Sequence, residues 1–517
     1  MLVHQFLETN AELHSHREAL VHLDDRVTYI ELERGANRLA NFLIDSGLKP
    51  GDRIAILLDS SINYVISYFA VLKGGGIVVA LNTATTSRII KNILSDCTPS
   101  AIIVHKQYAH FLTDIIDDLE SVETLVIDGH FERLERKKNL RIESYCEIQL
   151  NGDTKRPSIN ISSDDTASII YTSGTTGNPK GVTLTHSNLR ANTDSIVEYL
   201  SLTYEDKVMA ILPFFYSYGN SLLLTHIRVG GCLVIDSRFA YPNVVLEIMS
   251  REKATGFSGV PSTFAILMHK SKIHDYPWNH LRYLSQAGGP MSPALTLKIM
   301  EAIPHVKIFV MYGQTEASAR LSYLEPDRLL EKIGSIGKGI PGVTLTVKDD
   351  KGNICPVGET GEIIARGDNI MKGYWNQPEE TARVLKPDGL HTGDLAKTDE
   401  DGYLYIVSRK SDMIKSGAHR ISPKEIEEIL AEHEDIIESA VIGVPDEIMG
   451  ENIKAVIILK DKSNATQRDI LKHCRINLPV FKIPKIVEFR ENLPKTPSGK
   501  IKKHVLVSEH IQQKERG

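Results

Sequence analysis

The first long amphipathic pattern in the chain begins at Thr28. Thr28 and Glu31 have the spacing of a capping box, in which two side chains close the first turn of a helix. Apolar residues then recur at helical spacing until Gly47, and they are Ile30, Leu32, Leu39 and Leu43. The pattern predicts a helix over this stretch, followed by a strand at residues 53–58.

Apolar segments continue to alternate between helix and strand patterns after this point. Residues 63–72 and 87–94 have the pattern of helices, and residues 77–80, 101–104 and 166–171 that of strands. Such alternation is typical of a mainly parallel sheet with helices packed on it, so we predict an α/β fold. A chain of 517 residues also exceeds what one hydrophobic core usually organises.

The pattern changes near residues 408–412, where an apolar run meets charged residues. The elements expected beyond it are a capping box at Ser422 and Glu425, strands at 439–443, 454–459 and 485–489, and a helix at 468–478. We therefore predict a domain over residues 1–408 and a smaller C-terminal domain over 413–517, joined by residues 409–412, which the resemblance described below identifies as a hinge. The charged tail from Lys502 onward is expected to be a solvated, partly frayed end.

Composition and charge narrow the classes of function. The formal net charge is −6 and the two signs are interspersed, which disfavours a cationic groove for nucleic acid. No signal-peptide pattern and no run of roughly 18 apolar residues is present, although peripheral contact with a membrane stays open. The five cysteines are widely separated and lack zinc-ligand spacing, so we expect reduced thiols and a cytoplasmic protein.

The most informative segment is the loop after the strand predicted at 166–171. It reads Tyr171-Thr-Ser-Gly-Thr-Thr-Gly-Asn-Pro-Lys-Gly181. Its glycines let backbone N–H groups approach an anion, its hydroxyls add donors and Lys180 adds a point charge, an arrangement that suits a triphosphate. Gly177 is followed by Asn-Pro-Lys rather than by Walker spacing, which argues against an ordinary kinase or motor ATPase.

This loop resembles the signature of the adenylate-forming superfamily, which includes acyl-CoA synthetases, aryl-CoA ligases, luciferases and the adenylation domains of peptide synthetases. A second segment, Tyr312-Gly-Gln-Thr-Glu316, is similar to that family's next signature. The resemblance implies that Thr315 contacts the α-phosphate of ATP, and that Glu316 and Thr175 help to hold Mg²⁺. The implied ATP-binding residues of the two segments are Thr172, Ser173, Gly174, Thr175, Thr176, Gly177, Lys180, Tyr312, Gly313 and Gln314.

Further segments resemble the family's nucleotide-binding elements and follow in the family's order. Gln286-Ala-Gly-Gly-Pro290 looks like the adenine-binding turn, which implies contacts from Ala287, Gly288 and Gly289. His391-Thr-Gly-Asp394 matches the element whose Asp accepts hydrogen bonds from the ribose hydroxyls. Arg409 and Arg420 fall where the family has arginines near the ribose and phosphates.

The resemblance extends through the C-terminal part of the chain. Lys500, in Pro494-Lys-Thr-Pro-Ser-Gly-Lys-Ile501, corresponds to the lysine that reaches the carboxylate and the α-phosphate during adenylation. The family's hinge falls at Ser411, where many relatives have Asp or Lys, and the small domain is expected to rotate about it. Gly417 and Ala418 border the implied thiol channel, and Ala418 departs from the usual Gly.

The implied pocket for the acid is made of small and apolar groups. Tyr216 lies where many relatives carry an aromatic or His gate, and the other implied lining residues are Ser221, Val260, Pro261, Ala287 and Gly288. The segment 212–219 contains no acidic residue, so recognition of an amine by an Asp, as in the peptide-synthetase branch, is not supported. We expect a modest acyl or aryl acid.

The resemblance implies activation of a carboxylic acid by Mg-ATP to acyl-AMP, with release of pyrophosphate, and then acyl transfer to coenzyme A. Two alternatives stay open: a ligase that uses the phosphopantetheine arm of a carrier protein, and a non-catalytic nucleotide-binding protein. The presence of Lys180, Glu316, Asp394 and Lys500 argues against the second. The implied fold is a large N-terminal AMP- and acyl-binding region of two α/β subdomains plus a small barrel-like part, followed by a smaller mobile α+β C-terminal domain.

Overall fold

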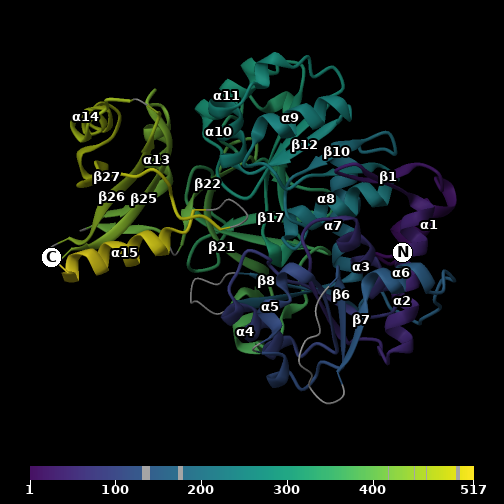
Figure 1. Ribbon diagram of the computed structural model, residues 1–517. Helices are drawn as coiled ribbons and strands as arrows, with labels where there is room; N and C mark the ends of the chain where they lie inside the picture. Colours follow the sequence, from purple (N-terminus) through teal and green to yellow (C-terminus); the bar gives the residue numbers. More distant parts are fainter. Residues whose placement is uncertain are drawn as a thin grey trace.

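Four β-sheets organise the computed structural model, which describes residues 1–113, 115–130, 140–172, 179–410, 412–416, 419–446, 449–461, 463–496 and 501–516. Two large sheets and one small sheet form the N-terminal region, and the fourth sheet belongs to a smaller C-terminal domain (Figure 1). The predicted α/β class and the division into a large region and a small domain are confirmed. Among the described residues, no helix is both long and apolar enough to cross a membrane.

The first subdomain is an eight-stranded sheet in the order β19-β9-β8-β4-β3-β5-β6-β7. Helices α2 and α3 cover one face and α4 covers the other. The strands are β3 (Arg53–Leu57), β4 (Ile77–Ala80), β5 (Ala101–His105), β6 (Thr124–Asp128), β7 (Arg141–Ser144), β8 (Thr166–Thr172), β9 (Lys180–Thr185) and β19 (Gly373–Tyr374). The helices are α2 (Tyr29–Asp45), α3 (Ile62–Lys73), α4 (Ser87–Cys97), α5 (His110–Thr113) and α6 (Tyr145–Asn151).

The second subdomain is a nine-stranded sheet in the order β16-β15-β14-β13-β12-β10-β11-β1-β2. Its strands are β1 (Glu18–His22), β2 (Asp25–Thr28), β10 (Lys207–Ala210), β11 (Cys232–Ile235), β12 (Gly256–Gly259), β13 (Tyr283–Gln286), β14 (Lys307–Tyr312), β15 (Ser322–Leu324) and β16 (Lys338–Gly339). The helices are α1 (Gln5–Leu13), α7 (His186–Leu200), α8 (Ser217–Val229), α9 (Pro242–Arg251), α10 (Pro261–Lys270) and α11 (Pro293–Ala302).

The packing of this second sheet fixes where a ligand can bind. Helices α1 and α8 share one apolar core with α2 and α3 of the first subdomain, whereas α9, α10 and α11 cover the opposite face. Strands β10, β12, β13 and β14 run parallel, so their carboxyl ends meet at one edge. Ligands of open α/β sheets bind outside such carboxyl ends. The predicted site residues after β12, β13 and β14 all follow this edge.

The small barrel-like part is an antiparallel sheet in the order β17-β18-β21-β20, with β22 paired to β21. Its elements are β17 (Val343–Lys348), β18 (Gly361–Gly367), β20 (Leu385–Lys386), β21 (Gly389–Thr398), β22 (Leu404–Arg409) and the helix α12 (Pro378–Val384). Before α12 the chain returns to the first subdomain, where β19 pairs with β9. The barrel-like part is therefore connected through one chain segment to the strand that begins at Lys180.

The C-terminal domain has the strand order β24-β23-β26-β25, with β27 paired to β26. Its elements are β23 (Ile414–Ser416), β24 (His419–Ile421), β25 (Ile436–Asp446), β26 (Gly450–Leu459), β27 (Ile486–Phe489), α13 (Pro423–Ala431), α14 (Gln467–Asn477) and α15 (Lys503–Arg516). Strand β22 ends at Arg409 and β23 begins at Ile414, while the exact domain and hinge limits stay predictions.

Two details of this domain correct the sequence analysis. The tail from Lys502 is not a frayed end, because α15 lies there and buries Leu506 against β25 and β26. The capping box expected at Ser422 and Glu425 does not form, and the Ser422 hydroxyl points to the Val407 carbonyl of β22, to which it donates a hydrogen bond. The residue thus ties α13 to the N-terminal region rather than closing its own helix.

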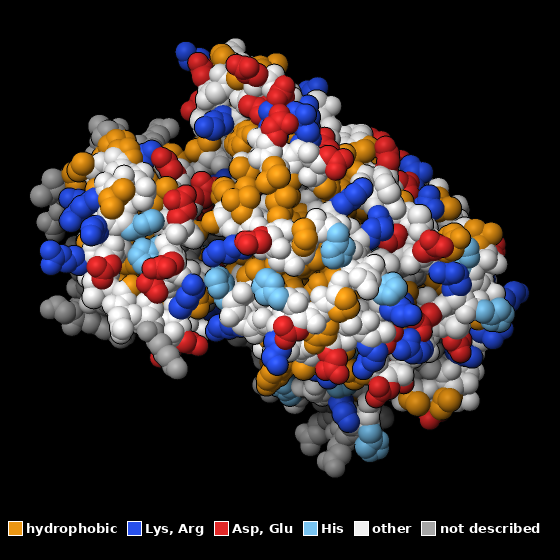
Figure 2. Space-filling view, turned by 90° about the horizontal axis from the view of Figure 1, so that it is seen from above, with side chains coloured by type: hydrophobic (Ala, Val, Ile, Leu, Met, Phe, Trp, Pro, Cys, Tyr) orange, Lys and Arg blue, Asp and Glu red, His pale blue; other side chains and the backbone are white. Residues whose placement is uncertain are grey.

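Charged side chains of both signs are mixed on the surface, as they are along the sequence (Figure 2). Figure 2 shows acidic and basic side chains interspersed over the face that it draws. No broad patch of a single sign of charge is visible on that face, where histidines and apolar groups lie between the charges. An extended cationic groove of the kind that tracks a nucleic-acid backbone is therefore not a feature of this side of the molecule.

Candidate active site

Strands β8 and β9 hold the two ends of the predicted phosphate loop. Thr172 and Lys180 are partners across the antiparallel ladder, and the Thr172 hydroxyl donates to the Lys180 carbonyl over 3.4 Å. The loop residues Ser173, Gly174, Thr175, Thr176 and Gly177 lie outside the described residues, so the contacts predicted for them, including a metal contact from Thr175, stay predictions. The fold therefore fixes the two ends of the loop directly opposite one another in the β8–β9 pair.

The Lys180 ammonium lies between an acid and an aromatic ring. It forms an ion pair with Glu380 of α12, and its nitrogen is 5.1 Å from the centre of the Tyr374 ring. The hydrogen bond from Lys180 lowers the pKa of the Glu380 carboxyl below its ordinary value. Lys180 is therefore oriented by neighbours that the sequence analysis did not identify.

Glu316 is oriented by the same tyrosine. The Tyr374 hydroxyl donates to Glu316 Oε1 over 2.7 Å, and burial together with the Glu316 carboxylate raises the pKa of Tyr374. The neighbouring Thr315 hydroxyl lies 3.2 Å from the hydroxyl of Ser217, at the start of α8. One short edge strand thus brings a tyrosine between the cation that ends the phosphate loop and the predicted metal-binding carboxylate.

The turn before Thr315 depends on a glycine. A Cβ at Gly313 would stand 2.0 Å from the Ala319 carbonyl oxygen and 2.8 Å from Arg320 Cα. Both obstacles are backbone atoms, which cannot move aside as a side chain can. Gly313 therefore lets the chain fold back on itself, and this positions Gln314, Thr315 and Glu316 at the edge of the sheet.

We expect Gly313→Ala to lower stability by about 1–3 kcal/mol and to weaken nucleotide binding, because the displaced backbone carries Thr315 and Glu316. Thermal unfolding with and without ATP measures both effects. Gly74→Ala is the control, since its backbone is in the right-handed region and the nearest obstacle to its Cβ is the flexible end of the Leu48 side chain, not backbone. Wild-type melting and ATP binding by the Gly313 variant would contradict the steric argument.

Asp394 has partners on both of its carboxylate oxygens. Tyr312 donates to Oδ2 over 2.7 Å, and Arg409 Nε donates to Oδ1 over 3.0 Å from the facing position on β22. Asp394 raises the pKa of Arg409, and burial together with Asp394 raises that of Tyr312. Each oxygen still has a second lone pair, so the ionised carboxylate can also accept hydrogen bonds from a ligand.

The predicted adenine-binding turn follows β13 directly. Gln286 closes it by donating from Nε2 to the Gly289 carbonyl over 2.7 Å, and Gly288 has a φ of +88°, which favours glycine. Ala287 is buried, whereas Gly289 is exposed. The buried Oε1 of Gln286 has no hydrogen-bond partner within the described part of the chain. The turn therefore offers small residues together with one uncommitted acceptor.

The residues predicted for the acid pocket are only partly brought together. Val260 is buried beside the ring of Tyr218, and Pro261 is the first residue of α10. The Tyr216 hydroxyl accepts a hydrogen bond from Asn82 Nδ2 over 3.2 Å. The Ser221 hydroxyl, in contrast, donates to the Tyr218 carbonyl within its own helix over 2.7 Å. Ser221 thus contributes bulk rather than a free hydroxyl.

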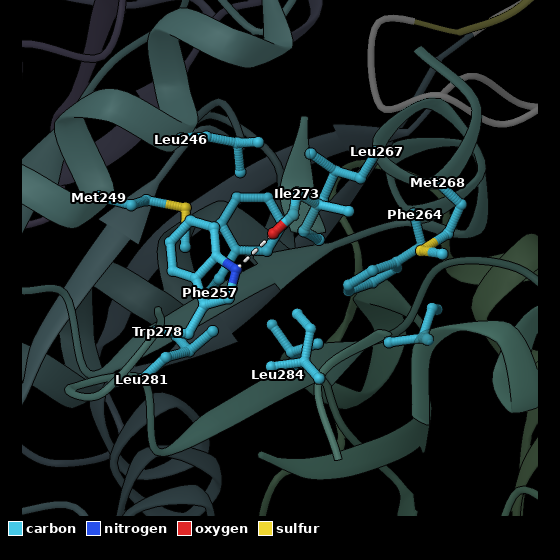
Figure 3. Close-up of a pocket in the computed structure, with 12 residues that line it drawn as sticks. Leu246, Met249, Phe257, Phe264, Leu267, Met268, Ile273, Trp278, Leu281 and Leu284 are labelled. Carbon is cyan, nitrogen blue, oxygen red and sulfur yellow. Dashed lines mark hydrogen bonds between the residues drawn. The ribbon is translucent and has the colours of Figure 1, made fainter. Parts of the chain in front are cut away.

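An apolar cavity lies on the opposite face of the same sheet (Figure 3). Its lining includes Leu284 of β13 and Phe264 and Met268 of α10, and its volume of about 10 Å³ has room for roughly one water. The only polar contact drawn there is the hydrogen bond from Trp278 Nε1 to the Ile273 carbonyl. We interpret the cavity as a packing gap beneath α9, α10 and α11.

The remaining predicted residues belong to the C-terminal part. Ser411, Gly417, Ala418 and Lys500 lie outside the described residues, and so does the side chain of Arg420, whose backbone pairs with Lys415 in β24 and β23. The hinge, the thiol channel and the catalytic lysine therefore stay predictions. The described site comprises Lys180, Thr315, Glu316, Asp394 and their partners.

Comparison with known proteins gives matches over most of the chain. A family model described as AMP-binding enzyme matches residues 7–375, and one for the AMP-binding enzyme C-terminal domain matches residues 425–500. The chain is 33% identical to a long-chain-fatty-acid–CoA ligase of Yersinia pestis, over 98% of this chain and 94% of the relative. It is 33% identical to a feruloyl-CoA synthase of an Amycolatopsis species, over 95% and 96% respectively.

Solved structures are similar over the whole length as well. The crystal structure of an anthranilate CoA ligase in complex with anthranoyl-AMP superposes with a TM-score of 0.93, at 29% identity, over 100% of this chain and 98% of that one. The similarity therefore includes both the large region and the small C-terminal domain.

Proposed function

Because this chain belongs to the family of AMP-binding enzymes and is an AMP-forming acid–thiol ligase, we propose that it joins a carboxylic acid to AMP and transfers the acyl group to coenzyme A. The geometry around Asp394 carries the proposal most directly. Its carboxylate is buried, held from two sides by Tyr312 and Arg409, and has lone pairs left for the two hydroxyls of a ribose. The relatives that are named CoA ligases support coenzyme A as the acceptor.

The first half-reaction needs little more than positioning and charge. The substrate carboxylate attacks the α-phosphorus of ATP, the acyl–phosphate bond forms, and pyrophosphate leaves with the electron pair of the broken bond. Two anions must approach one another, so fixed donors at the phosphates lower the barrier. We assign this role to Lys180 and Thr315, with Lys500 completing it as the resemblance implies. No residue of the enzyme acts as a nucleophile.

The residues present also fit a magnesium ion. Mg²⁺ prefers oxygen ligands and is usually held by one or two carboxylates together with substrate phosphates and waters. Glu316 uses one carboxylate oxygen for Tyr374 and has the other without a hydrogen bond among the described residues. In the part of the chain that the structure describes, no group of three or more His, Cys, Asp or Glu side chains is arranged to hold a metal ion. The ion would neutralise phosphate charge.

The proposal also covers the thiol that accepts the acyl group and the cellular compartment. Coenzyme A and the phosphopantetheine arm of a carrier protein present the same thiol, so a carrier-protein ligase stays the alternative. Ser411 as the hinge and Gly417 and Ala418 as channel residues serve either acceptor. The five cysteines are free thiols, which suits the reducing cytoplasm.

The test is exchange of labelled pyrophosphate into ATP with a panel of fatty, aromatic and amino acids. We expect exchange that depends on one class of acid and on Mg²⁺, followed by thioester formation when coenzyme A is added. A phosphopantetheinylated carrier protein in place of coenzyme A separates the two acceptors. If no acid supports exchange although ATP binds, the proposed function is wrong.

A further inference from the structure

Arg320 is a buried cation that the proposed chemistry does not use. Its residue surface is only 2% exposed, and it forms no ion pair with a carboxylate in the part of the chain that the structure describes. Lys73 is a useful contrast, because this other buried cation is paired with both Glu8 and Glu33. A buried charge without a counter-ion is unfavourable, so the position of Arg320 calls for a specific explanation.

The neighbours that bond to the Arg320 guanidinium are all neutral. Nε points at the sulfur of Met311 and Nη1 at the carbonyl of Ala319, each over 3.4 Å. The guanidinium carbon lies 3.9 Å from the centre of the Tyr218 ring, and the hydroxyls of Tyr199 and Tyr218 also contact the group. A guanidinium has five N–H donors and is always charged. These neutral partners leave it without an anion.

The same guanidinium lies beside the predicted acid pocket. Tyr218, on which it stacks, packs with Val260 in one apolar cluster and with Ala287 in another. The Tyr218 hydroxyl bonds to Ser285 of β13, and the Ser285 hydroxyl lies 2.7 Å from that of Ser258 on β12. Side chains alternate between the faces of a strand, so Ser285 and Met311 face α7 and α8, away from the cavity that Leu284 lines.

Arg320 and the hydroxyl groups around Tyr218 therefore lie where the ends of β12, β13 and β14 meet α8. Val260 and Ala287, which are predicted to contact the acid, are next to them. An acid whose far end were purely apolar would leave the guanidinium without a counter-charge. A carboxylate at that end could accept two parallel hydrogen bonds from the N–H groups of the guanidinium. The arrangement thus favours a substrate with a second acceptor group.

We propose that Arg320 is a specificity-determining residue, and that the preferred acid has a second anionic oxygen group, best a carboxylate, at the end remote from the carboxyl that is activated. This inference rests on the proposed function and deepens it, since it names the class of acid. Tyr218 holds the guanidinium by its ring face, and the Tyr218 hydroxyl is held in turn by Ser285, which bonds to Ser258. The apolar cavity of Figure 3 takes no part.

The experiment compares matched pairs of acids that differ only in the second group, such as hexanoic and hexanedioic acid, butanoic and butanedioic acid, and benzoic and terephthalic acid. In pyrophosphate exchange, we expect the wild type to prefer the doubly acidic member of at least one pair by about tenfold in kcat/KM. Arg320→Met should lower kcat/KM for that member by roughly 10–100-fold and change the plain acid by less than about threefold. For the doubly acidic member, the kcat/KM of Arg320→Lys should lie between those of the wild type and Arg320→Met, because lysine keeps the positive charge but lacks the planar set of N–H donors.

The outcomes separate this inference from the function on which it rests. Preference for the plain acid in every pair, or an equal loss for both members in Arg320→Met, would assign Arg320 a structural role only. The rise in melting temperature that each acid gives in the presence of AMP is a second readout that needs no turnover. Wild-type protein that supports no exchange with any acid would overturn the proposed function, and equal thermal shifts within every pair would overturn the role of Arg320.

Discussion

Glu316→Gln should lower the rate of acid-dependent pyrophosphate exchange by about 100–1,000-fold at a fixed, moderate concentration of Mg²⁺. The amide can still accept the hydrogen bond that Tyr374 donates to Oε1, so the fold of the turn should persist. What the variant loses is the negative charge on the oxygen that has no partner among the described residues. Part of the lost rate should return as the Mg²⁺ concentration is raised, and a titration of rate against Mg²⁺ measures this.

Tyr374→Phe is the matched control, because it removes the hydroxyl and keeps both the carboxylate and the ring below Lys180. A hydrogen bond to a charged group contributes about 1.5–3 kcal/mol, which is roughly 10–150-fold in rate if the whole contribution is lost. We expect a loss of about tenfold, at the low end of this range, because Glu316 keeps its charge and part of its orientation. The order of effects is the critical result. Exchange by Glu316→Gln at the wild-type rate over the whole Mg²⁺ range, or a larger loss in the tyrosine variant, would remove Glu316 from the metal site.

Local sequence signals predicted much of the fold. The capping box at Thr28 and Glu31 forms, and the helix that it begins, α2, ends at Asp45, just before the expected Gly47. The strand predicted at 77–80 has the bounds of β4. These elements combine a clear hydrophobic period with a start or stop signal inside a few residues, which is the information that a single sequence contains.

Features that depend on tertiary packing were not predictable in this way. The segment after Lys502 is charged and looks solvated, yet α15 forms there because Leu506 is buried against β25 and β26. Ser422 has the spacing of a capping residue, but its hydroxyl donates a hydrogen bond to the Val407 carbonyl and does not cap α13. In both places a contact with a distant part of the chain outweighs the local preference.

The candidate site, too, was predictable from the sequence only in part. Motif resemblance pointed to Glu316 and Asp394, and the structure gives each a partner that orients it. Tyr374 could not be predicted, because it meets Glu316 only after β19 pairs with β9. Arg320 had one usable signal, a charged residue in the otherwise small and apolar run 317–321, but its lack of a counter-ion is visible only in the fold.

Asp394→Asn should raise the KM for ATP by roughly 10–100-fold and change kcat much less. Hydrogen bonds from ribose hydroxyls to a carboxylate are charge-assisted and contribute about 1.5–3 kcal/mol, and they hold the nucleotide equally in the ground state and in the transition state. The variant also leaves Arg409 without the anion that raises its pKa, so the guanidinium is no longer fixed at the facing position on β22. Initial rates of exchange at varied ATP concentrations measure the change.

The ribose contact itself can be separated from a general loss of structure by using 2′-deoxy-ATP. Wild-type protein should prefer ATP over the deoxynucleotide, and Asp394→Asn should lose most of that preference, because the deleted hydroxyl no longer had a charged acceptor. Tyr312→Phe removes the hydrogen bond to Oδ2 while leaving the carboxylate charged, so it should keep the preference even if it binds ATP more weakly. An Asp394 variant that still discriminates between the two nucleotides as wild type does would place the ribose elsewhere, and the assignment of the nucleotide site would then rest on Lys180 and Glu316 alone.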